Sequence, residues 1–247
     1  LNLVNMALGA WFVLSLGMTA DGVGLSALIA EISAVLLGGF LIWRSIHKTK
    51  ARASWAQIWN REKVLRTLSA NGDIMIRTLC LVFAFAWFAA RGARAGDVTI
   101  AANAVLLHFF EVAAYLIDGF AYASEALVGQ SVGAKNRARF NRAVRLTTLW
   151  ALVVGAICSA IIWFAGPWFI DLMTVNPEVR EAARQYLFWA SLTPFLGCIC
   201  FQFDGIFTGA MATRDMRNMM IVSLLIYLAS WWILESVLGN HGLWAAL

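Results

Sequence analysis

Long apolar stretches alternate with short charged segments along the whole chain. Seven of these stretches approach or exceed the roughly 20 residues that an α-helix needs to cross a bilayer. An eighth begins at Gly242 and runs to the last residue. The sequence therefore predicts an all-α fold, a polytopic bundle of transmembrane helices. The predicted spans are residues 1–18, 23–43, 72–91, 99–131, 145–165, 184–212 and 216–238.

The fourth predicted span carries three carboxylates at seven-residue spacing, Glu111, Asp118 and Glu125. Seven residues are almost two helical turns, so all three lie on one stripe together with Tyr115 and Tyr122. A carboxylate facing lipid at mid-helix costs about 3 kcal/mol on the insertion scale. We therefore expect this stripe to face a water-filled cavity or polar partners inside a bundle, as the lining of a transport pathway does.

Composition and charge agree with a membrane protein. Hydrophobic residues make up 61% of the chain and charged residues 13%, against about 25% charged in soluble domains. The net charge of +5 needs no nucleic-acid partner, because the cations are sorted by the predicted spans. Fourteen of the nineteen Lys and Arg residues fall on one side, four on the other, and Arg77 lies within a span. The positive-inside rule places the larger group in the cytoplasm.

The longest loop, residues 44–71, is basic and separates two spans from the five that follow, so it is the predicted boundary between two bundles. Its centre, residues 54–59, could form a short interfacial helix. A weak repeat supports the boundary: the Gly24–Ala27 segment resembles Gly242–Ala245 with six spans between the copies. Two parallel six-helix repeats would have this spacing.

The sixth predicted span begins with a clear helix-start signal. Asn176 suits an N-cap and Pro177 suits the first helical position. Pro194 lies within the span and should kink it. Beyond this proline, Gly205 and Gly209 form a small-xxx-small pair that permits close helix approach. These features predict a kinked helix that packs tightly against a neighbour.

Asp204, mid-helix in that span, is the second strong candidate for a cation or substrate site, and a structural hydrogen bond is its alternative role. Asp73 and Arg77 are spaced i, i+4 in the order that favours an ion pair within a helix. Asn103 is polar and a candidate pathway residue. Catalytic and metal-binding motifs are absent from the sequence, so neither a catalytic residue nor a metal site is predicted.

Five segments carry a resemblance to a known family: Asn71–Arg77, Asp118–Gln130, Asp204–Ala210, Arg217–Asn218 and Gly239–Trp244. Together they resemble the multidrug and toxic compound extrusion (MATE) transporters and, within that family, the branch named for DNA-damage-inducible protein F. The family has twelve helices in two six-helix lobes. The resemblance implies that residues 1–43 are the last two helices of the first lobe, residues 44–71 the inter-lobe linker, and residues 72–247 most of the second lobe.

The resemblance also implies a function. Members export cationic or amphipathic organic compounds in exchange for protons or sodium, so a bacterial inner (plasma) membrane and no cofactor besides the coupling ion are expected. In this branch an acid in the first helix is implicated in ion coupling, and that helix is not part of this chain. The fragment alone is therefore not expected to transport. The candidate residues would line the second-lobe side of the cavity: Asp118, Glu111, Asp204, Glu125, Tyr122, Asp73, Arg77 and Asn103.

Three alternatives stay open at this stage. A lipid-linked saccharide flippase would have a similar helix count, but a cavity rich in Arg and Lys, whereas the candidates here are mainly acidic. An integral membrane enzyme would need a catalytic constellation near one face. A non-transporting assembly subunit would differ from a transporter only in showing no substrate flux, so a flux assay would distinguish the two. The sequence leaves the substrate, the coupling ion and the oligomeric state undetermined.

Overall fold

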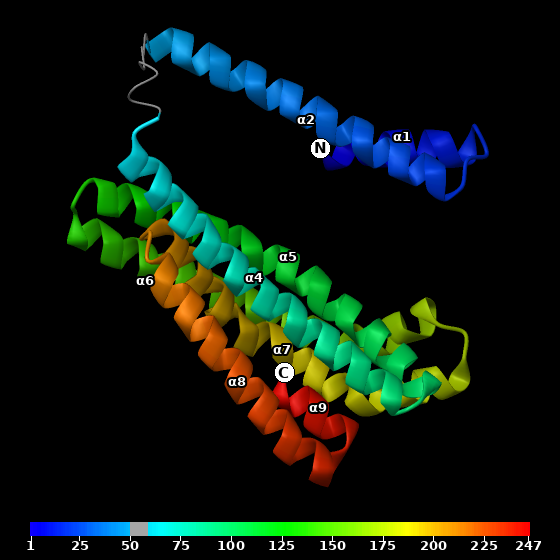
Figure 1. Cartoon of the computed structure of the whole chain (residues 1–247). Helices are drawn as coiled ribbons and strands as arrows, with labels where there is room; N and C mark the ends of the chain where they lie inside the picture. Colours follow the sequence, from blue (N-terminus) through cyan, green and yellow to red (C-terminus); the bar gives the residue numbers. More distant parts are fainter. Residues whose placement is uncertain (50–58) are drawn as a thin grey trace. The chain divides into compact units, whose positions relative to one another are not determined.

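The computed structural model describes residues 1–49 and 59–247. The chain divides into two compact units, Leu1–Lys63 and Val64–Leu247, and each is described by itself (Figure 1). The centre of the predicted basic loop, with most of the expected interfacial helix, lies outside the described residues. Two parts of the predicted loop are helical instead. One helix continues to Thr49, and the next begins at Arg61.

The first unit is built on two helices, α1 (Asn2–Leu14) and α2 (Ala20–Thr49). They are joined near their ends by a hydrogen bond of 2.8 Å that the Ser26 hydroxyl donates to the Asn5 side chain. α1 has 13 residues, a length of about 20 Å, against about 30 Å of hydrocarbon in a bilayer. It is thus shorter than the predicted span 1–18, because the chain turns at Gly17, which adopts a positive φ.

The second unit holds the other helices, and six helices of the described chain are long and apolar enough to cross a membrane, α2 and α4 to α8. Six of the seven predicted spans are confirmed in this sense. The predicted start of an eighth span corresponds to the short helix α9 (Asn240–Ala246). The remaining bounds are α4 (Arg61–Arg94), α5 (Asp97–Gly133), α6 (Arg137–Met173), α7 (Pro177–Gly209) and α8 (Thr213–Leu238).

The core of the second unit lies where α5, α6 and α7 pack on one another (Figure 1). Cys198 of α7 is buried there against Ile117 of α5 and Ala151 of α6. Farther along α7, a Cβ atom added to Gly205 would collide with the carbonyl oxygen of Ala121 in α5. A Cβ atom added to Gly209 would collide with the carbonyl oxygen of Glu125, also in α5. The close approach predicted from the two glycines is confirmed.

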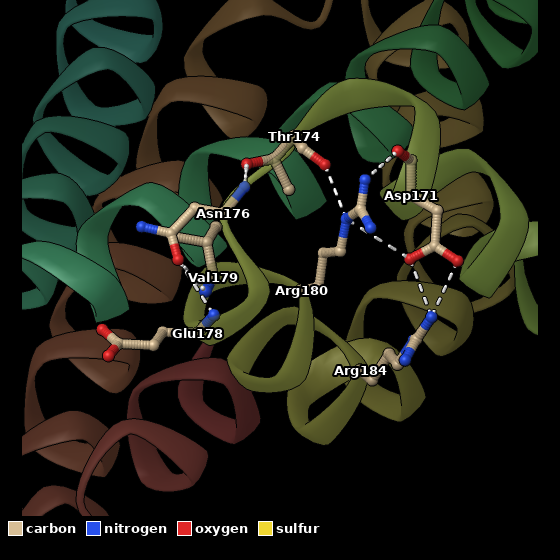
Figure 2. Close-up of polar contacts among 7 residues, drawn as sticks. All are labelled: Asp171, Thr174, Asn176, Glu178, Val179, Arg180 and Arg184. Carbon is tan, nitrogen blue, oxygen red and sulfur yellow. Dashed lines mark hydrogen bonds and ion pairs between the residues drawn. The ribbon is translucent and has the colours of Figure 1, made fainter.

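The connection between α6 and α7 also matches its sequence signal (Figure 2). The Asn176 side chain accepts hydrogen bonds from the backbone amides of Glu178 and Val179, so Asn176 is the predicted N-cap. Two arginines then tie the first turns of α7 back to α6. Arg184 donates to both carboxylate oxygens of Asp171 at 2.7 and 2.8 Å, and Arg180 donates to two backbone carbonyls. These contacts hold the hairpin that brings α7 into the bundle.

α4 and α8 are linked by two ion pairs of opposite polarity. Near the N-terminal half of both helices, Arg217 of α8 contacts Asp73 of α4 at 2.6 Å. Farther along, Arg91 of α4 contacts Glu235 of α8 at 2.8 Å. Each pair joins residues 144 positions apart, so the two helices run parallel in a constant register.

Candidate cation and substrate site

Two charged side chains of the second unit form an ion pair, and a third lies close enough to feel both charges. Arg77 of α4 and Asp204 of α7 form an ion pair with 2.6 Å between the Nη2 and Oδ2 atoms. Asp118 of α5 interacts electrostatically with both: the Asp204 carboxylate repels its charge and the Arg77 guanidinium attracts it. The arrangement joins the two strongest acidic candidates from the sequence around one cation.

The packing of α5 on α7 explains why the two acids approach each other. Gly205 lies directly against the Ala121 backbone, and only a residue without a side chain permits that contact. Asp204 precedes Gly205, and Asp118 precedes Ala121 by nearly one helical turn. The contact at Gly205 therefore fixes how α5 and α7 are aligned along their axes, and with it the relative positions of the two carboxylates. Nearer the N-terminus of α7, the backbone amide of Phe195 donates a hydrogen bond of 3.1 Å to the Ser159 hydroxyl of α6. Phe195 directly follows Pro194, the proline inside the helix.

The Arg77–Asp204 pair is only partly satisfied. The two side chains are 20% and 32% exposed, respectively. Arg77 Nε and Asp204 Oδ1 are buried and have no hydrogen-bond partner among the described residues. Buried polar atoms in proteins are normally paired with protein or water. This site can therefore accept a further polar group without breaking the contact that already exists.

The expected pair between Asp73 and Arg77 within one helix is wrong. Asp73 is buried and accepts hydrogen bonds from Thr213 at 3.0 Å and from Arg217 at 2.6 Å. The short Asp73 side chain points toward α8, whereas the longer Arg77 side chain reaches α7. Each of the two charges has its partner on a neighbouring helix, at a buried or half-buried position. An exposed i, i+4 pair would contribute only a few tenths of a kcal/mol.

The acidic stripe of α5 lies on one unbroken helix, as predicted, but its members have different surroundings. Asp118 is half-buried beside the Arg77–Asp204 pair. Glu111 is exposed and contacts His108 Nδ1 at 3.1 Å. Glu125 is half-buried, with its backbone against α7. Tyr115 and Tyr122 are exposed, and the described residues provide no hydrogen bond from either ring to a carboxylate.

Asn103 lies apart from these carboxylates in a buried contact between α5 and α9. Its side-chain amide exchanges hydrogen bonds with Asn240 at 3.0 and 3.1 Å. The Trp244 indole donates a hydrogen bond of 2.9 Å to the side-chain carbonyl oxygen of Asn103. All these partners come from the segment that follows α8, so Asn103 joins the end of the bundle to its centre.

Some polar features of the second unit were not anticipated from the sequence. Arg91 was assigned to a loop, yet it donates three hydrogen bonds to Glu235 and lies over the Trp231 ring, 4.6 Å from its centroid. Gln202 is buried with both amide atoms unpartnered among the described residues. The two ion pairs between α4 and α8 share one sequence separation, which can be read from the sequence. This separation indicates ion pairing only when the two helices are known to be neighbours.

The site contains no recognisable metal centre. Within the part of the chain that the structure describes, no three His, Cys, Asp or Glu residues are grouped so that they could hold a metal ion. The arrangement instead combines two carboxylates with one guanidinium. Carboxylates of this kind can bind a proton or attract a positively charged group.

Comparisons with known proteins agree with this architecture. The sequence model of the MatE family matches residues 59–233. DNA damage-inducible protein F of Escherichia coli (strain K12) is 34% identical, with 100% of this chain and 53% of that protein covered. A probable multidrug resistance protein NorM of Aromatoleum aromaticum is 27% identical, with 87% of this chain and 45% of that protein covered. The chain thus spans about half the length of the curated relatives it matches.

The fold is also shared with a solved structure. The MATE transporter VcmN of Vibrio cholerae in its bent form superposes with a TM-score of 0.82 at 18% identity, over 99% of this chain and 55% of that one. This likeness supports the helix arrangement alone, whereas the family match covers most of the sequence. The chain therefore belongs to the MatE family, a family of membrane transporters and not of enzymes, and it is a multi-pass membrane protein.

Proposed function

We propose that this chain is the part of an ion-coupled antiporter that comprises the end of its first lobe and most of its second, and that the antiporter exports cationic or amphipathic organic compounds with a proton or sodium as the coupling ion. The observation that carries the proposal is the proximity of Asp118 and Asp204 to Arg77 among membrane-spanning helices of the second unit. Ionisable side chains in membrane-spanning helices are costly and are typical of substrate and ion pathways.

The acids favour a positively charged cargo. Asp118, Glu111 and Glu125 lie on one face of α5, and much of that face is not covered by other residues of the described chain. A low-dielectric cavity lined by carboxylates concentrates cations and disfavours anionic lipid-linked saccharides. Cationic cargo and coupling ion would then compete for the same carboxylates, which is the requirement for exchange.

The assignment to lobes is part of the same proposal. Residues 1–43 would complete the first lobe, residues 44–71 would link the lobes, and residues 72–247 would form most of the second lobe. A bacterial inner membrane is the proposed location, since the relative from Escherichia coli is bacterial. Transport would need the helices that make up the other half of the relatives' length.

The direct test is Asp204→Asn in the full-length protein. We expect loss of dye efflux from cells while the abundance of the protein in the membrane stays near normal, because the amide cannot release a proton or balance a cation. Glu178→Gln is the matched control, since it removes a carboxylate from an exposed position in the first turn of the same helix. Normal efflux by Asp204→Asn at normal abundance would contradict the proposed role.

The coupling ion can be identified in everted vesicles. An imposed proton gradient and an imposed sodium gradient are compared as drivers of uptake of a cationic dye. We expect one of the two to drive uptake, and Asp204→Asn to abolish that response. Uptake that neither gradient drives would contradict an ion-coupled mechanism.

A further inference from the structure

The ion pairs of the second unit are not equivalent. Arg91 donates three hydrogen bonds to Glu235 and lies over an indole ring. Arg217 and Thr213 together satisfy Asp73. In each of these two pairs both oxygens of the carboxylate accept a hydrogen bond, which is typical of structural links between helices.

The Arg77–Asp204 pair is different, since it consists of one contact between Nη2 and Oδ2. Arg77 Nε and Asp204 Oδ1 are buried, and neither has a hydrogen-bond partner within residues 1–49 and 59–247. The guanidinium also attracts Asp118, so it has two acids to neutralise rather than one. In the two structural pairs both carboxylate oxygens accept a hydrogen bond, whereas in this pair only one of the two does among the described residues.

The charges in this cluster determine what it can hold. With all three groups ionised, one guanidinium faces two carboxylates, so one negative charge has no counterion. Without Arg77 the same two carboxylates would hold two positive charges. An isolated charge in a low-dielectric setting is costly. The number of positive charges that the site binds should therefore equal the number of carboxylates without a counterion.

From these observations we infer that Arg77 is a tethered cation that occupies one of the two acidic positions and thereby restricts the site to one additional positive charge. Arg77 is then the residue that sets the preference of the transporter for singly charged over doubly charged organic cations. The inference rests on the proposed function, since it assigns the charge class of the cargo taken by the same site.

Ethidium and propidium are suitable probes, because they share one aromatic ring system and carry one and two positive charges, respectively. Binding of each dye to the purified full-length protein in lipid nanodiscs is measured by fluorescence polarisation. We expect Arg77→Gln to raise the affinity for propidium relative to ethidium by about tenfold, as one unit charge is removed from a partly solvated site. Arg77→Lys keeps the charge and should keep the wild-type ratio.

Arg94→Gln is the matched control for net charge. It removes a guanidinium from the same helix at an exposed position outside the cluster. The proposal requires that it leave the dye ratio unchanged. An equal change in Arg77→Gln and Arg94→Gln, or no change in Arg77→Gln, would overturn the role of Arg77 and leave the loss of efflux in Asp204→Asn intact.

A second-site test compares variants in which the Arg77–Asp204 pair is already lost. In Asp204→Asn, Arg77 and Asp118 balance each other, so ethidium binding should fall. Adding Arg77→Gln leaves Asp118 without a counterion, and ethidium binding should recover toward the wild-type value. A double variant that binds ethidium no better than Asp204→Asn would overturn the inference. Failure of the wild type to bind either dye would contradict both this inference and the proposed function.

Discussion

The carboxylate of Asp73, buried in α4, accepts a hydrogen bond of 2.6 Å from the guanidinium of Arg217, which lies 144 positions later at the start of α8. Arg91 and Glu235 repeat the same separation with the charges exchanged between the helices. α4 and α8 are thus aligned by two contacts of opposite polarity. Because a shift of one helix by a single turn would break both contacts, the pairs specify register as well as contact.

The Asp73–Arg217 pair predicts an unequal response to the loss of each partner. Arg217→Gln leaves a buried carboxylate with only the Thr213 hydroxyl, and should lower stability by about 2 kcal/mol. Asp73→Asn leaves an arginine that is 30% exposed and can reach water, so its cost should be about 1 kcal/mol. Apparent midpoints of thermal unfolding in detergent measure both. A greater loss in Asp73→Asn would contradict this account of the pair.

Gly205 and Gly209 predict a steric effect that a third glycine controls. Gly205→Ala places a methyl group against the Ala121 carbonyl, which should force α5 and α7 apart and lower stability by about 2 kcal/mol. Gly209→Ala meets the Glu125 backbone in the same way. Gly119→Ala in α5 has open space around its Cβ position and should be neutral or stabilise the helix by up to about 1 kcal/mol.

Thermal midpoints of these three variants, and efflux of a cationic dye by each, test the packing argument. We expect Gly205→Ala to impair efflux more than Gly119→Ala at equal abundance, because the glycine sets the spacing between Asp118 and Asp204. Equal behaviour of Gly205→Ala and Gly119→Ala would show that the two helices are not in close contact.

The two ends of the stripe on α5 should respond differently to loss of charge. Asp118→Asn removes a carboxylate beside Arg77 and Asp204, and should weaken binding of a cationic dye by about tenfold while sparing a neutral dye. Glu111→Gln removes an exposed carboxylate that contacts His108, so a change of less than about threefold is expected. Equal losses in the two variants, or equal losses for both dyes, would make the stripe architectural.

Orientation in the membrane follows from the sorted positive charges. Arg137→Cys, exposed at the start of α6, should resist an impermeant thiol reagent in intact cells, in a cysteine-free background. Val175→Cys, exposed between α6 and α7 at the other end of the hairpin, should react. The opposite pattern of labelling would reverse the topology.

Local signals in the sequence predicted much of the fold correctly. The span ranges depend on length and hydropathy, the Asn176 cap on neighbouring backbone amides, and the alignment of Glu111, Asp118 and Glu125 on the helical period. Each of these features involves residues close together in the chain, or a property summed over one helix. The first predicted span was too long, because the turn at Gly17 ends α1 three residues earlier, at Leu14.

The sequence by itself determined that the chain is a helical membrane bundle, which residues are costly to place in it, and that α7 needs small residues where it meets a neighbour. Only the tertiary structure decided the partners of the charges. Asp73 and Arg77 satisfy the helical spacing rule for a pair with each other, yet each pairs with a different helix. An ion pair depends on which faces of α4, α7 and α8 lie opposite one another, and that is set by the packing of the whole bundle.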